Sequence, residues 1–269
     1  MSFEGSSRFR SDIAWSDAEH VVVHGLDLVQ DLMGVTNLGD FGFLTLFRRL
    51  PNAGESQVFN AMLVGLAEHG LTANAIAARL THLGAPESLQ GAVAAGLLGL
   101  GTRFVGTIEG TARLLQEGPE NNNWKTDELE LRRLADELSE NFLSRGQAVP
   151  GLGHPTHKPV DPRAERLFDL AHENGLDGAP ERLLRAVKQL TETRLERVLP
   201  VNVTGAIGAI STSMGLRWEV SRGLGVMARA VGLVGHVLEE VSQPLADSIQ
   251  RDVEERATRH LADGFRESH

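Results

Sequence analysis

The chain has 269 residues, and 41% of them are hydrophobic, which is enough for one large domain or two modest ones with a buried core. It carries a formal charge of −10 and contains no cysteine. These numbers exclude a disulfide framework, a thiolate nucleophile and a cysteine metal site. They also argue against a nucleic-acid partner, which needs a dominant basic face, but leave open a small basic site for an anionic ligand.

The N-terminal stretch "MSFEGSSRFRSDIAWSD" is polar and lacks the apolar segment of a signal peptide. Apolar stretches such as "GAVAAGLLGLG" are too short and too rich in glycine to span a bilayer. We therefore expect a cytoplasmic protein with no membrane partner.

Most of the chain shows apolar residues at spacings of three and four, which is typical of helices, interrupted by glycine and proline. The pattern predicts helices over residues 54–70, 73–84, 86–101, 126–146, 162–175, 179–195, 221–243 and 244–265. β-Branched runs occur only at 20–25 and 198–205, and they predict two short strands. The sequence therefore indicates an all-α fold, with a loop or hinge at 118–127 and a second change of character at 146–162.

The chain contains ten histidines. His20 and His24 have the spacing of a helical metal site, but the valines between them predict a strand, which would separate the two rings. No H-E-x-x-H motif occurs, so we expect no metal. Four other histidines lie in polar helical surroundings and are predicted to be solvated: His82, His172, His260 and His269.

Three further histidines have two interpretations each. His69 ends an apolar helix in "AEHGLT", where it could be a simple C-terminal cap or a site residue whose cationic form the helix dipole favours. Thr72 and Asn74 offer caps to the next helix. His154 follows glycines in "PGLGHP", where backbone amides can approach a ligand. His236 lies on a helix and could be a core histidine.

Nucleotide motifs are incomplete, because "GLGHPT" and "GLGTRF" each lack a third glycine. The order of five other stretches is more informative: "AEHGLTANAIAARL", "GAVAAGLLGLGTRFVGTIEGTARLL", "PGLGHPTHKPVDPRAERL", "LPVNVTGAIGAISTSMGL" and "ARAVGLVGHVLEE". Together they resemble the citrate synthase superfamily over roughly residues 20–245. Within it they resemble the short lyase-type branch, which comprises citryl-CoA lyases and the citrate-synthase-like module of ATP-citrate lyase.

The resemblance implies an almost all-α chain in which a smaller part closes over a substrate held between the two parts. We expect residues 1–269 to form a single citrate-synthase-like chain. Its large helical part would comprise 1–117 and 200–269, and its smaller closing part about 118–199. The resemblance also implies a homodimer or a higher even oligomer.

The resemblance assigns roles residue by residue. His69 would contact the oxygen substituents of the keto acid, and His154 would hydrogen-bond the oxygen at the carbon–carbon bond that is made or broken. Arg229 would bind a substrate carboxylate, and we place His236 and Arg103 in the same substrate site.

Coenzyme A, as part of the substrate or product, would lie along the loop from Gly151 to Arg163. Gly151 and Gly153 would let the backbone approach it. Lys158, Arg163 and Arg145 would contact its phosphates, because guanidinium and ammonium groups bind phosphate well.

The sequence departs from the family pattern in three places. The catalytic aspartate of an N-V-D motif is replaced in Asn202-Val203-Thr204, and Thr204 cannot be a general base near pH 7. Pro155 stands where an arginine of the G-x-G-H-R motif would grip a keto-acid carboxylate. "RFVGT" at 103–107 replaces an H-G-G-A motif, a loss that the lyase branch shares. We keep Asn202 and Thr204 in the catalytic site, with either a water molecule that they hold or one of three carboxylates as the substitute: Asp40, Glu68 or Glu109.

The resulting hypothesis is a carbon–carbon lyase that cleaves citryl-CoA or a related 3-hydroxyacyl-CoA to acetyl-CoA and a carbonyl compound. Loss of an arginine–carboxylate pair costs about 2 kcal/mol or more, which favours a substrate with fewer carboxylates than citryl-CoA. A citrate-synthase-like condensing enzyme and a non-catalytic CoA-thioester-binding homologue remain alternatives.

Overall fold

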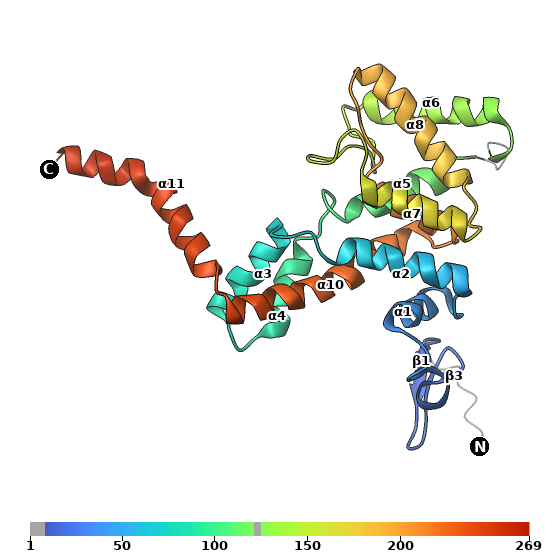
Figure 1. The fold of residues 1–269 in the computed structure, drawn as a ribbon, viewed down its shortest axis with the longest axis horizontal. Coiled ribbons are helices and arrows are strands. Elements are labelled where there is room, and N and C mark those ends of the chain that lie inside the picture. The colour runs from blue at the N-terminus through green and yellow to red at the C-terminus, as the bar shows by residue number, and fades with distance from the viewer. Residues whose placement is uncertain (1–8, 121–124, 269) are drawn as a thin grey trace.

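The computed structural model describes residues 9–120 and 125–268. Part of the predicted 118–127 loop, the first residues of the N-terminal stretch and His269 lie outside the described residues. The fold is all-α, as predicted, apart from a small sheet near the N-terminus (Figure 1). No helix in the described part of the chain has the length and apolar character needed to cross a membrane.

The sheet is antiparallel with the order β1 (Ala14–Ser16), β2 (Val21–Val23) and β3 (Leu26–Asp27), and a π-helix follows at Leu28–Leu32. The helices are α1 (Leu38–Phe47), α2 (Ala53–Ala67), α3 (Ala73–Gly84), α4 (Leu89–Leu98), α5 (Gly106–Glu117), α6 (Glu128–Leu143), α7 (Pro162–Glu173), α8 (Ala179–Leu195), α9 (Val203–Ser213), α10 (Trp218–Ser242) and α11 (Ala246–Ser268).

The predicted strand at 20–25 is confirmed as β2, which separates His20 from His24. The predicted strand at 198–205 is wrong. Only Val201 makes an isolated bridge, to Leu152, and α9 begins at Val203. The side chain of Asn202 caps this helix by accepting a hydrogen bond from the Gly205 amide.

Helices α1, α5 and α9 were not predicted. Helix α9 is buried on almost every side, so its sequence is apolar all round and shows no amphipathic period. The prediction of solvated histidines holds for His172 and His260, which are exposed, whereas His82 is half-buried.

The largest hydrophobic core is built around α9 and draws side chains from α2, α5, α6, α7, α8 and α10. Phe59 of α2, Leu138 of α6 and Phe168 of α7 all belong to it. This core thus includes residues of both predicted parts, and the boundaries at 118 and 199 stay a prediction.

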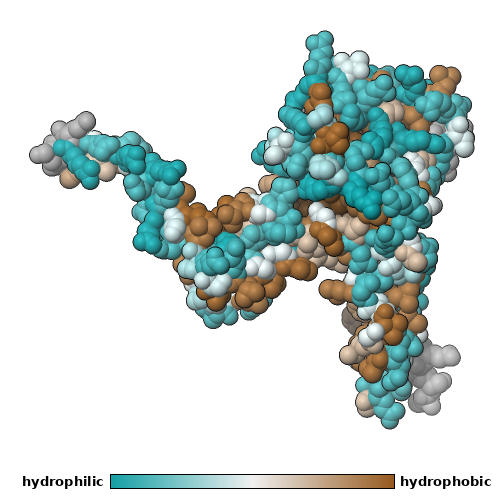
Figure 2. Space-filling model, viewed as in Figure 1, coloured by the Kyte–Doolittle hydropathy of each residue, from teal (hydrophilic) through white to brown (hydrophobic). Residues whose placement is uncertain are grey.

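A separate cluster of Ala78, Ala92, Leu233 and Val237 joins α3 and α4 to the C-terminal half of α10. Helix α11 then extends away from the rest of the chain (Figure 1). Apolar side chains are exposed over the region of α3, α4 and α10 (Figure 2). The end of α10 and most of α11 after its first turn are therefore less covered than the rest of the fold.

Candidate functional site

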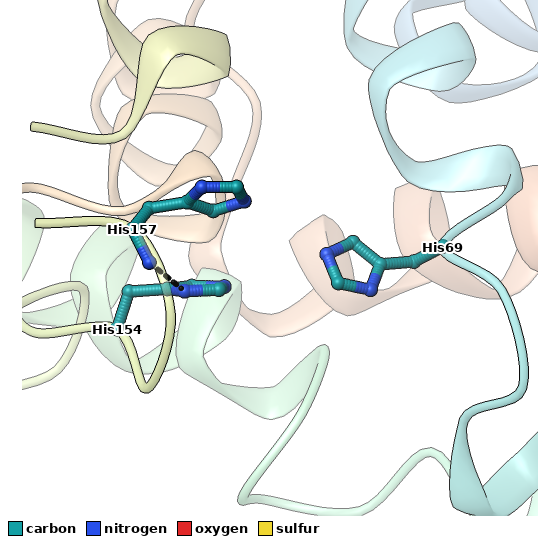
Figure 3. A group of neighbouring side chains, drawn as sticks. All are labelled: His69, His154 and His157. Carbon is teal, nitrogen blue, oxygen red and sulfur yellow. Dashed lines mark hydrogen bonds between the residues drawn. The ribbon is translucent and has the colours of Figure 1, made fainter.

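Two separate segments bring the predicted histidines together. One is the His69 turn, residues 67–74 between α2 and α3, and the other is the His154 loop, residues 149–161 before α7. The ring centroids of His69 and His154 lie 6.1 Å apart. His157 joins them, with its centroid 4.4 Å from that of His154 and 6.4 Å from that of His69 (Figure 3). His157 is thus a third candidate for the site, which the sequence analysis missed.

The His69 turn is held by a guanidinium from α10. Arg229 is buried and donates to the Ala67 carbonyl, the Glu68 carboxylate and the Thr72 hydroxyl. Glu68 in turn accepts from the backbone amides of His69 and Gly70. The predicted carboxylate-binding residue Arg229 therefore lies beside His69, and in this structure it positions the turn.

The structure decides two local questions about this turn. Helix α2 ends at Ala67, so His69 lies beyond the helix and the interpretation as a C-terminal cap is wrong. Thr72 is the N-cap residue of α3, as predicted, but its side chain makes no capping bond, because its hydroxyl donates to the Asn74 side chain.

Burial opposes the charged form of Glu68, but the Gly70 amide, the charge of Arg229 and the contact with His236 outweigh it. The pKa of Glu68 is therefore held below its ordinary value. His236 bonds Glu68 through Nε2, at 3.1 Å, and its Nδ1 lies 3.3 Å from the Arg79 Nε. Because arginine only donates, Nδ1 of His236 accepts and Nε2 carries the proton. Both nitrogens are engaged inside the protein, which favours the core interpretation of His236.

Glycines allow the sharp course of the His154 loop. Gly151 and Gly153 have φ of +80° and +85°, where other residues are strained. A Cβ built on Gly151 would lie 2.7 Å from the Gly205 Cα and would also meet the Thr111 hydroxyl. The structure thus explains Gly151 by close packing against α9, and its predicted contact with coenzyme A stays a prediction.

His154 is fixed in one tautomer by its own loop. Its Nδ1 accepts hydrogen bonds from the amides of Thr156 (3.1 Å) and His157 (2.9 Å), so the neutral ring carries its proton on Nε2. Burial lowers the pKa of His154, and His157, Arg163 and His69 lower it further against the opposing effect of Asp161. His154 is therefore a neutral N–H donor near pH 7, suited to bind an oxygen atom.

Asp161 anchors the end of this loop. Its carboxylate is fully buried, accepts from Arg163 at 2.9 Å and accepts from the Val203 amide at the start of α9. Burial raises the pKa of Asp161, but the Arg163 hydrogen bonds and charge prevail and hold it below its ordinary value. The Arg163 guanidinium lies 3.3 Å from the Nε2 of His154, and because Nε2–H and the guanidinium are both donors, this contact is not a hydrogen bond and Nε2–H can still donate to another oxygen. The structure thus places Arg163 beside His154, and its contact with a phosphate of coenzyme A stays a prediction.

Asn202 and Thr204 lie at the start of α9, next to the His154 loop. The Asn202 amide group donates to the Gly153 carbonyl, and the Thr204 hydroxyl donates to the Asn202 carbonyl oxygen at 2.6 Å. The Thr107 hydroxyl lies 2.7 Å from that of Thr204. Thr204 therefore belongs to a chain of neutral polar groups.

The three carboxylates considered as substitutes are all engaged elsewhere. Asp40 accepts hydrogen bonds from Ser56 and Asn60 between α1 and α2. Glu109 pairs with Arg222 at 2.9 Å. Glu68 is the closest of the three to the histidines in the chain, and its oxygens are used by the His69 turn and His236.

Three predicted cations are exposed: Arg103, Arg145 and Lys158. Arg103 precedes α5, Arg145 follows α6, and Lys158 lies in the His154 loop. None makes an ion pair with another described residue, so these charges are available to an anionic ligand.

The three histidines have the spacing of a metal site, since one nitrogen from each lies within 4.8 Å of the others. The donor set fits a metal ion poorly. Nδ1 of His154 is occupied by two amides, and its Nε2 faces the Arg163 guanidinium. The cluster is better suited to donate hydrogen bonds to substrate oxygens.

An open cavity of about 890 Å³ is lined by Glu68, Leu71, Arg79, His236 and Glu239 among others. Its carboxylates make it a poor site for the phosphates of coenzyme A. The convergence of His69, His154 and His157 therefore marks the candidate site better than cavity size does.

The family model for the citrate synthase C-terminal domain matches residues 27–251. The chain belongs to the citrate synthase family. A citryl-CoA lyase from Hydrogenobacter thermophilus has 31% sequence identity and a TM-score of 0.77, covering 88% of each chain. This likeness confirms the predicted resemblance to the lyase branch.

Two longer proteins also match. The ATP citrate lyase of Methanosaeta concilii, solved in complex with (3S)-citryl-CoA, has the same fold, with 23% identity, a TM-score of 0.73 and coverage of 88% of this chain and 39% of that one. A probable ATP-citrate synthase of Dictyostelium discoideum is 26% identical over 221 residues, 76% of this chain and 34% of that protein. The chain thus spans about a third of the length of the curated ATP-citrate synthases it matches.

Proposed function

We propose that this protein is a carbon–carbon lyase that cleaves citryl-CoA, or a related 3-hydroxyacyl-CoA, to acetyl-CoA and a carbonyl compound. The observation that carries the proposal is the meeting of His69 with His154, whose ring is fixed as a neutral Nε2–H donor. Such a donor stabilises the oxygen at the bond that breaks, because a buried hydrogen bond strengthens as charge develops on that oxygen. Condensation is the same reaction in reverse.

The carbonyl product has fewer carboxylates than oxaloacetate in this proposal. Pro155 offers no charge at a position next to His154, and Arg229 is already paired with Glu68. Arg163 is the guanidinium closest to the reacting histidine, and Asp161 neutralises it in part. One substrate carboxylate beside Arg163 is therefore the arrangement that these charges favour.

Coenzyme A is the ligand that carries the acyl group, and the exposed cations Arg103, Arg145 and Lys158 supply charge for its phosphates. Related ATP citrate lyases have been solved in complex with (3S)-citryl-CoA and with citrate and coenzyme A, which supports this class of ligand.

We further propose that the chain forms a homodimer or a higher even oligomer. Four apolar side chains of α10 repeat at spacings of three and four and are 46–68% exposed: Val231, Val234, Leu238 and Val241. A stripe of this kind is typical of a helix that packs on another helix. Helix α11, which extends from the body, presents further apolar residues at Val253, Leu261 and Phe265.

The test is an assay of the purified protein with citryl-CoA and with 3-hydroxyacyl-CoA thioesters that lack one or more of its carboxylates, following acetyl-CoA by chromatography. Release from citryl-CoA would support the family activity, and release only from a less charged thioester would support the altered carbonyl site. No release from any thioester, with coenzyme A binding detected by calorimetry, would favour the non-catalytic alternative. The chain of neutral groups around Thr204 is the observation behind that alternative.

A matched pair of variants sharpens the assay. His154→Ala removes the Nε2–H donor and should lower turnover about 10²–10³-fold while coenzyme A still binds. His260→Gln changes an exposed histidine of α11 and should have no effect. Equal turnover of the two variants would contradict the role of His154.

A further inference from the structure

Cleavage of a 3-hydroxyacyl thioester moves one proton. A base takes the hydroxyl proton, the carbon–carbon bond breaks with its electrons passing into the thioester enolate, and the α-carbon then receives a proton. This step rests on the function proposed above. His154 cannot take the hydroxyl proton, because Nδ1 accepts two amide hydrogen bonds and Nε2 already carries hydrogen.

The carboxylates near the site are equally unsuited. Asp161 is buried against Arg163, and Glu68 is bonded to two amides, Arg229 and His236. Each is stabilised as an anion by these partners, so it is a weak base. The Thr204 hydroxyl is neutral and donates to Asn202.

Two imidazoles remain, those of His69 and His157. Neither ring makes a hydrogen bond with any other residue in the described part of the chain, and Figure 3 shows the His69 ring directed across a gap toward the other two. Imidazole is the side chain whose protonation changes between pH 5 and 8, so either ring can accept and return a proton.

The geometry favours His157. Its ring lies over that of His154 with 4.4 Å between centroids and 31° between planes, whereas His69 is 6.1 Å away. The His157 amide donates to the Nδ1 of His154, so the same backbone fixes both rings. His157 is half-buried and His69 is exposed. The His157 ring is therefore fixed against the ring whose Nε2–H holds the oxygen, whereas the exposed His69 ring reaches the same gap from a separate segment.

We propose that His157 is the acid–base group of the site. Neutral His157 takes the proton of the substrate hydroxyl while His154 donates to the oxygen. The carbon–carbon bond breaks, the oxygen becomes a carbonyl, and the bond electrons form the thioester enolate. The His157 imidazolium then gives the same proton to the α-carbon, which leaves acetyl-CoA and neutral His157. One ring serves both steps, since hydroxyl oxygen and α-carbon are attached to the same carbon atom.

The experiment compares the wild-type protein with His157→Gln and His157→Ala on whichever thioester the wild type cleaves. We expect kcat to fall about 10²–10⁴-fold in both variants, with KM and the Kd for coenzyme A changed less than about threefold. Imidazole added to the buffer should restore part of the activity of His157→Ala. The acid limb of the pH profile of kcat should disappear in His157→Gln. His260→Gln is the matched control and should behave as the wild type.

Each other outcome overturns the inference in a different way. Wild-type kcat in His157→Gln would show that another group moves the proton, and the proposed lyase function would stand. Loss of coenzyme A binding together with activity, with no rescue by imidazole, would show a structural role for His157. If the wild type cleaves no thioester, the proposed function fails and the inference fails with it.

Discussion

The two segments that supply the histidines of the site are built from different interactions. Polar and charged side chains of α3 and α10 hold the His69 turn: Arg229 and His236 of α10 bond Glu68 in the turn, and Arg79 of α3 bonds His236. Backbone hydrogen bonds and the close approach of glycines hold the His154 loop. We therefore expect the first segment to respond to removal of charge and the second to added volume.

The largest effect is expected from Arg79→Leu. Arg79 is 1% exposed and pairs with the buried Glu240 at 2.8 Å, with Glu239 and with His236. Its removal leaves Glu240 uncompensated, and breaking a buried ion pair from one side costs about 3–5 kcal/mol of the free energy of unfolding. Urea titration measures the change in the free energy of unfolding. Arg113→Leu breaks an exposed pair with Glu117 and should change the free energy of unfolding far less, so equal costs would contradict the comparison.

Gly151→Ala tests the effect of added volume in the His154 loop. A Cβ at this position meets the Gly205 Cα at 2.7 Å and requires φ of +80°, so we expect a loss of about 2–4 kcal/mol from overpacking and strain. Gly215→Ala is the matched control, because Gly215 has the same φ of +80° and nothing within 4 Å of its Cβ. Urea titration of both variants separates the cost of overpacking, which only Gly151→Ala has, from the cost of backbone strain, which both variants share. Identical losses would show that strain alone explains Gly151.

The motifs were sufficient to find His69 and His154, because each lies in a short stretch where neighbouring residues define the turn. They did not reveal His157, since a spacing of three residues has no fixed geometry outside a helix. Its position depends on the hydrogen bond from its amide to His154. The tautomer of His154 depends on the same bond and could not be predicted either.

Long-range pairing was the other missing part. Arg229 was predicted to bind a substrate carboxylate, and its contact with Glu68 joins residues far apart in the chain. Helix α9 was predicted as a strand over its first residues, because a fully buried helix shows no period. Asn202 is a good helix N-cap residue, and that signal could have corrected the prediction.

Asp161→Asn gives the smallest expected effect and joins the two kinds of interaction, since this buried carboxylate bonds both Arg163 and the Val203 amide of α9. Its pKa is lower in the folded protein than its ordinary value, so its charge stabilises the fold at neutral pH, and this stabilisation is lost as pH falls through the folded pKa. We expect the variant to lose about 1–3 kcal/mol between pH 5 and 8. The difference in the free energy of unfolding between variant and wild type should narrow below about pH 4, as Asp161 takes up a proton in the wild type.

The control is Asp136→Asn, which removes one partner of the exposed pair with Arg194. Its free energy of unfolding should differ from that of the wild type by less than about 0.5 kcal/mol at every pH. If the difference in the free energy of unfolding between Asp161→Asn and the wild type does not change with pH, the shape of the side chain, and not its charge, holds the His154 loop to α9.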